Sequence, residues 1–185
     1  VQYNVKYPLK KDTNIHFNKF TPKLSLMYSP NKTKNLSLDN RRIDSSKIFS
    51  FNRIANNETV EGGTSLTYGI SYSKINKNNN KDLINLDVSS LFRLQNNFDL
   101  PTSSTLGKKS SDIFGKLEMY PNDPLSFKYS FAIDNNFDKS NYDSISSTLS
   151  INKFVTTFEY SDEKNSAENE SFTSNSTFFE LDKNN

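Results

Sequence analysis

The sequence predicts an all-β protein, an antiparallel up-and-down transmembrane β-barrel of which this chain supplies about eight strands. Three observations lead there. Alternation of apolar and polar residues recurs along the whole chain, without a helical stripe. Two alternating stretches, at 64–73 and 125–134, are near the roughly ten residues with which a tilted strand crosses a bilayer. The links between stretches are alternately short and long, as in outer-membrane barrels.

The composition fits a wall that is apolar on one face only. Hydrophobic residues make up 33% of the 185 residues, yet 13% are aromatic, and the mean hydropathy is -0.75. A net charge of +2 with mixed signs argues against disorder, and the lack of a basic cluster argues against nucleic-acid binding. The chain has no cysteine for a disulfide and no long apolar run for a membrane-spanning helix.

The first half of the chain contains four alternating stretches. Residues 1–7 alternate before Pro8, and 24–28 alternate before Pro30. The clearest stretch follows, with the apolar residues Leu66, Tyr68, Ile70 and Tyr72 on one face and Ser65, Thr67, Gly69, Ser71 and Ser73 on the other. A fourth runs from Ile84 to Phe92.

The second half continues the pattern. Residues 113–120 form a stretch that Pro121-Asn122-Asp123-Pro124 turns into 125–133, and Asn152-Lys153 connects 145–151 to 154–160. A last strand is expected from Phe172 towards Leu181. The side chains expected to face lipid are Leu66, Ile70, Tyr72, Leu125, Phe127, Tyr129 and Phe131.

The links sort into two sets. Those at 74–82, 121–124 and 152–153 are mostly short, whereas those at 95–111, 135–143 and 161–170 are longer and polar. Short turns are typical of the periplasmic end of an outer-membrane barrel and long loops of the extracellular end. The segment 29–63 is therefore expected to be an unusually long extracellular loop, and such loops are usually functional or disordered.

No pattern predicts catalysis, a cofactor or a metal. His16 has no partner at ligand spacing, and Asp134–Asp138 lacks the glycine and the final glutamate of an EF-hand loop. Glu58 and Glu61 have no histidine or cysteine converging on them. Gly62-Gly63 is not followed by a helix, so it fits a turn or bulge where a strand begins rather than a phosphate cradle. The protein is not expected to be an enzyme.

The loop that leads into the strand at 64–73 resembles the LPS-assembly protein LptD (OstA/Imp) family. That family carries a pattern close to N-L-F-S-x-x-R-F-x-G-x-D-R-x-E-G-G-x-x-x-x-Y-G-L-x-Y. Ile48-Phe49-Ser50 and Arg53-Ile54 match its beginning, while 60–64 and 68–72 match its end. Residues 56–59 depart from it, reading Asn-Asn-Glu-Thr in place of G-x-D-R.

Three further segments are similar to the family, in order along the chain. They are 7–9 (Y-P-L), 21–31 (P-x-x-x-L-x-Y-x-P-N) and 111–117 (S-D-x-x-G-x-L). From Tyr142 onward only the strand pattern supports the assignment. The motif residues, expected to have structural or loop roles, are Phe49, Arg53, Glu61, Gly62, Gly63, Tyr68, Gly69, Asp112 and Gly115.

The resemblance implies residence in the outer membrane of a Gram-negative bacterium and a non-enzymatic role in lipopolysaccharide transport. Such a barrel is plugged by an LptE-like lipoprotein, is fed by an LptA-like periplasmic bridge through an N-terminal domain, and inserts lipopolysaccharide into the outer leaflet. Residues 1–185 would be a middle part of the barrel domain, truncated at both ends. Open strand edges are costly in lipid, so the chain alone is not expected to form a functional pore.

Two other interpretations stay open at this point. Another outer-membrane barrel, such as a porin or an autotransporter, explains the alternation but not the ordered motif segments. A secreted β-sandwich adhesion domain predicts strands of about five or six residues that bury apolar side chains between two sheets.

Overall fold

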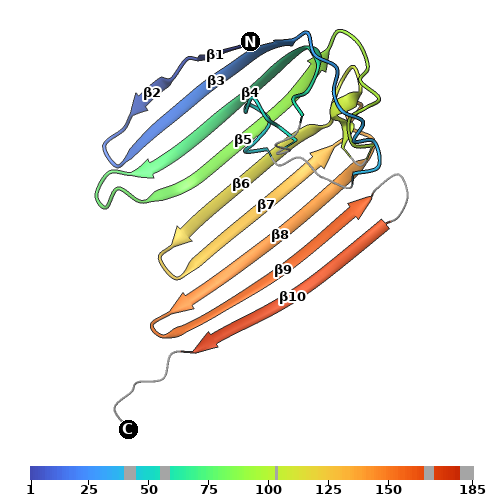
Figure 1. Cartoon of the computed structure of the whole chain (residues 1–185). Helices are drawn as coiled ribbons and strands as arrows, with labels where there is room; N and C mark the ends of the chain where they lie inside the picture. Colours follow the sequence, from blue (N-terminus) through green and yellow to red (C-terminus); the bar gives the residue numbers. More distant parts are fainter. Residues whose placement is uncertain (40–44, 55–58, 103, 165–168, 180–185) are drawn as a thin grey trace.

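The computed structural model describes residues 1–39, 45–54, 59–102, 104–164 and 169–179. Within them the chain forms one ten-stranded sheet (Figure 1) and a 3₁₀ turn at Thr105–Gly107. The strands are β1 (Gln2–Lys6), β2 (Leu9–Asp12), β3 (His16–Ser29), β4 (Gly63–Asn76), β5 (Asp82–Arg93), β6 (Ile113–Asn122), β7 (Leu125–Ile133), β8 (Ser140–Ile151), β9 (Phe154–Lys164) and β10 (Asn169–Phe179).

The sheet is an antiparallel meander. Consecutive strands pair from β3 to β10, and β1 and β2 both pair with β3. Because β1 lies against 23–27 and β2 against 17–20, the two are halves of one edge strand interrupted at Tyr7-Pro8. The sheet is open, with β1 and β2 at one edge and β10 at the other (Figure 1). The predicted all-β, up-and-down architecture is confirmed, and an open sheet is consistent with part of a larger barrel.

The strand count differs from the prediction of about eight. β2 was not predicted because Leu9-Lys10-Lys11-Asp12 carries no alternation, and its place comes from pairing with β3. β3 begins at His16 rather than near Leu24, since polar residues interrupt its apolar pattern. A sandwich requires two packed sheets with short strands; the described residues form one sheet, and β3 and β4 each have 14 residues.

The register gives the sheet two different faces. Leu26, Leu66 and Phe92 are cross-strand neighbours on one face, which we call the outer face. The same register continues through β6 to β8. All seven side chains that were expected to face lipid lie on this outer face: Leu66, Ile70, Tyr72, Leu125, Phe127, Tyr129 and Phe131. Their contact with lipid remains a prediction.

The links lie at two ends of the sheet. The turns at 13–15, 77–81, 123–124 and 152–153 share one end in Figure 1, and the long loops 30–62 and 94–112 lie at the other, which we call the loop end. The other two predicted long links are wrong in length. β8 begins at Ser140, which leaves 134–139, and β9 extends to Lys164, which leaves only 165–168 before β10.

The hydrophobic core lies between the long loops and the inner face, and not between two sheets. Ile48 and Ile54 come from loop 30–62, and Leu100 and Leu106 from loop 94–112. They pack with Leu91, Phe114 and Ala132 from the strands. The loop end of the inner face is thus covered by the protein's own loops.

Across the described ranges, no helix has the length and apolar character needed to span a bilayer.

Candidate functional site

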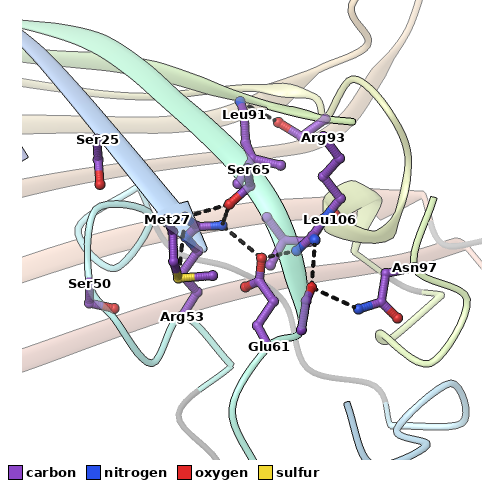
Figure 2. Close-up of polar contacts among 12 residues, drawn as sticks. Ser25, Met27, Ser50, Arg53, Glu61, Ser65, Leu91, Arg93, Asn97 and Leu106 are labelled. Atoms are coloured by element: carbon purple, nitrogen blue, oxygen red, sulfur yellow. Dashed lines mark hydrogen bonds and ion pairs between the residues drawn. The ribbon is translucent and has the colours of Figure 1, made fainter. Parts of the chain in front are cut away.

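A buried cluster of charged side chains joins loop 30–62 to the inner face of the sheet. The loop folds back so that Arg53 and Glu61 reach Arg93, the last residue of β5 (Figure 2). Arg53 also contacts Ser65 and Met27, which lie on the inner faces of β4 and β3. We refer to Arg53, Glu61 and Arg93 as the Arg–Glu–Arg cluster.

One carboxylate oxygen connects the two arginines. Glu61 Oε1 accepts a charge-assisted hydrogen bond from Arg53 Nη1 at 2.8 Å and also contacts Arg93 Nη2. Arg53 donates further from both terminal nitrogens to Ser65 Oγ, at 3.2 Å each. The loop is therefore attached to β4 as well as to β5.

Arg93 extends the cluster to the second long loop. Its Nε donates to the carbonyl oxygen of Leu106 at 2.6 Å, and its Nη1 donates to that of Gly62 at 3.2 Å. Leu106 lies in the 3₁₀ turn of loop 94–112. A single side chain thus holds both loops against the end of β5.

The cluster is out of contact with water. The side chains of Arg53 and Glu61 are 0% exposed and that of Arg93 is 1% exposed. Burial lowers the pKa of Arg53 to about 10, which still leaves its guanidinium charged at neutral pH. Glu61 Oε2 and Arg53 Nε have no hydrogen-bond partner in the described part of the chain. The arrangement suits a fixed structural connection, in which each charge depends on the other two.

Gly62 and Gly63 follow Glu61 for two different steric reasons. A Cβ atom on Gly62 would lie 2.1 Å from the backbone oxygen of Asn31, so only glycine lets the two ends of loop 30–62 approach this closely. Gly63 has φ +91, which L side chains rarely adopt. Gly63 is the first residue of β4, so a positive φ lies where the sequence predicted a turn or bulge at the beginning of a strand.

Replacing Gly62 with alanine is expected to destabilise the loop end by about 1 to 3 kcal/mol, because the clash is with backbone that cannot rotate away. The measurement is thermal unfolding of the full-length protein in detergent micelles. Gly115→Ala is the control: its Cβ would meet the Phe131 ring at 2.0 Å, and that ring can turn outward. Equal losses for the two variants would contradict this account.

The remaining motif residues lie outside the cluster. Phe49 is partly buried against the core, with Lys23 Nζ 5.7 Å from its ring centroid. Tyr68 is on the outer face. A Cβ atom added to Gly69 would lie only 2.6 Å from the backbone oxygen of Val88, so a side chain at this position would clash with β5. Gly115 lies under Phe131. The sequence motif therefore includes residues that attach loop 30–62 to the sheet and residues of the sheet itself.

Asp112, the last of these motif residues, precedes β6 at the loop end. Its Oδ2 accepts a hydrogen bond from Asn141 Nδ2 at 2.8 Å, and its backbone nitrogen donates to Thr105 Oγ1 at 2.7 Å. Burial raises the pKa of the Asp112 carboxyl, and side-chain hydrogen bonding with Asn141 and Thr105 opposes part of that rise. Asp112 connects loop 94–112 to β8.

The raised pKa of Asp112 predicts a pH dependence. The folded state binds this proton more tightly than the unfolded state, so the contribution of Asp112 to stability is full below its ordinary pKa of 3.8 and is lost as pH rises through the folded-state pKa. In Asp112→Asn this dependence disappears. The stability of the wild type minus that of the variant should therefore fall as pH rises from 4 to 7, measured as paired melting temperatures. A flat or rising difference would contradict the burial of this carboxyl.

Arg93 lies outside the sequence motifs and was not predicted as a site residue. The only signal was its position on β5, two residues after Leu91 and on the same inner face.

Glu58 and residues 56–57, which belong to the part of the motif that departs from the family pattern, lie outside the described residues. His16 begins β3, and in the Asp134–Asp138 turn Asp134 Oδ1 accepts a hydrogen bond from the backbone of Asn136 at 2.7 Å. No group of three or more potential ligand side chains is placed for a metal ion within the residues that the structure describes.

Comparison with known proteins agrees with this architecture. A search of curated protein sequences gave no significant match. The family model described as "LptD: LPS transport system D" matches residues 1–182, which is nearly the whole chain. The chain therefore belongs to the LptD family of the lipopolysaccharide transport system.

Proposed function

We propose that this chain forms part of the wall of an outer-membrane translocon that inserts lipopolysaccharide into the outer leaflet without changing it covalently. The observation that carries the proposal is the two-faced sheet of an LptD family member. The outer face presents apolar side chains from β3 to β7. The inner face presents serines, threonines and charged residues. Such a wall separates a polar lumen from lipid.

The inner face has the chemistry that a polar head group requires. A hollow of about 370 Å³ lies on β6–β9, lined by Lys116, Lys128, Ser144, Ser146 and Glu159 among others. A second hollow of about 250 Å³ shares Lys116 and adds the Lys23–Asp87 pair, which is 2.7 Å apart. Mixed charges and hydroxyl groups solvate phosphorylated sugars without holding them permanently.

The family supports the proposed partners and location. An LptE-like lipoprotein would occupy the lumen, and an LptA-like periplasmic bridge would deliver lipopolysaccharide from below. The described parts of the two long loops leave the inner face of β7–β10 largely uncovered in Figure 1, and we expect such a plug to bind there. The protein would then lie in the outer membrane of a Gram-negative bacterium.

Photo-crosslinking in living cells tests the proposal. A photoreactive residue replaces Lys128 on the inner face or Phe127, its neighbour on the outer face, in the full-length protein. We expect lipopolysaccharide adducts at position 128 and phospholipid adducts at position 127. The absence of lipopolysaccharide at position 128, together with unchanged surface lipopolysaccharide after depletion of the protein, would overturn the proposed function.

A further inference from the structure

A separate hollow of about 600 Å³ opens at the loop end of the sheet. One side is the beginning of loop 30–62, with Asn31, Lys32 and Thr33, and the other is the segment after β5, with Gln95, Asn96 and Asn97. The volume is within the range of small-ligand sites. It lies apart from the two hollows on the inner wall, with which it shares no lining residue.

The floor of this hollow is fixed by hydrogen bonds that cross between the two loops. Thr33 Oγ1 accepts from Gly62 N at 2.8 Å and from Asn97 Nδ2 at 2.7 Å. The carbonyl oxygen of Gly62 accepts from Arg93 Nη1 and, at 3.4 Å, from Asn97 Nδ2. Arg93, which contacts Glu61 (Figure 2), thus connects the floor to the Arg–Glu–Arg cluster. A ligand would meet a preorganised surface and would not have to order two loops.

The rim presents amide groups that are free to bind. The side chains of Asn31, Gln95 and Asn96 are exposed and make no hydrogen bond within the described residues. Each amide offers two donors and an acceptor. That combination matches a sugar hydroxyl, which also donates and accepts.

Charge favours a neutral ligand over a phosphate group. The cation Lys32 and the anion Asp99 both line the hollow, so their charges offset each other. Arg93, the other cation of the lining, is already engaged by Glu61. No excess positive charge remains to select an anion.

We propose that this hollow binds the uncharged saccharide part of a glycolipid at the cell surface, with Asn31, Gln95 and Asn96 as the recognising side chains. The proposal rests on the proposed function, because that function places the loop end outside the cell, next to newly delivered glycolipid. It adds a binding site beyond the inner wall, at which the sugar chain is held as the lipid part leaves.

Calorimetric titration of the full-length protein in detergent tests this site. The probe is the lipid-free oligosaccharide released from the surface glycolipid of the source bacterium, with inorganic phosphate as a second titrant. The variant Gln95→Ala/Asn96→Ala removes two exposed amides without touching the floor. We expect it to weaken oligosaccharide binding about tenfold, as the loss of two hydrogen bonds implies.

Asn136→Ala is the matched control, since Asn136 is an exposed residue in the β7–β8 link at the same end of the sheet but outside the hollow. Its affinity should equal that of the wild type. No oligosaccharide binding, equal binding by the double variant, or competition by phosphate would each overturn the site. If the wild type delivers lipopolysaccharide but does not bind the oligosaccharide, only the saccharide site is disproved. If it delivers no lipopolysaccharide, the proposed function is disproved.

Discussion

Replacing Glu61 with glutamine is expected to lower the free energy of unfolding by about 3 to 5 kcal/mol, the largest loss of any variant considered for this chain. The change keeps the shape of the side chain but removes the anion that Arg53 and Arg93 share. Two guanidinium groups would then remain buried without a counter-ion. Loop 30–62 should detach, which is measured as a lower melting temperature and faster trypsin cleavage within 30–62 in detergent micelles.

Two further variants separate this effect from a general effect of charge removal. Glu118→Gln breaks the Lys116–Glu118 pair, whose side chains are 40% and 18% exposed, and should cost no more than about 1 kcal/mol. Replacing Arg53 and Arg93 with methionine and Glu61 with leucine removes every charge of the cluster. That triple variant should regain much of the stability lost in Glu61→Gln, because apolar replacements of buried ionic groups are often neutral. A Glu61→Gln protein as stable as Glu118→Gln would show that the cluster does not hold the loop.

Two of the three residues of the Arg–Glu–Arg cluster could be predicted from the sequence. Arg53 and Glu61 belong to one short motif, so a family pattern identifies both without knowledge of their contact. Arg93 lies 32 positions beyond Glu61, and only the pairing of β4 with β5 brings it to the cluster. From the sequence, the side chain of an inward-facing arginine at a strand end could lie in solvent, in a lumen or in a buried ion pair. The fold of the two loops decides among them.

The strands show the same division between local and non-local information. Alternation predicted β4 and β7 closely because each of their faces meets one kind of environment. β2 escaped prediction because its place depends on hydrogen bonds to β3 and not on its own side chains. β8 and β9 extend into polar sequence, such as Ser140-Asn141 and Asp162-Glu163-Lys164, where pairing with a neighbour maintains the strand. The links there are consequently shorter than their composition predicted.

Replacing Ile70 with arginine is expected to lower the stability of the membrane-inserted protein by about 2 to 4 kcal/mol, the cost of a cation on the lipid face near the bilayer midplane. Ile70 is near the middle of β4, on the outer face between Pro22 of β3 and Val88 of β5. None of its cross-strand neighbours carries a charge that would offset that of an arginine. The measurement is reversible denaturant unfolding of the full-length protein in phospholipid vesicles.

Ser73→Arg provides the matched control on the same strand. Ser73 points to the inner face, between Lys19 and Asn85, where water or a lumen partner solvates a new charge. Its expected loss is below about 1 kcal/mol, because a charge that stays solvated pays no desolvation cost. Strand propensity does not account for the difference between the two variants, since both place arginine in β4. A larger loss for Ser73→Arg than for Ile70→Arg would reverse the assignment of the faces, and with it the proposal that the inner wall carries a polar head group.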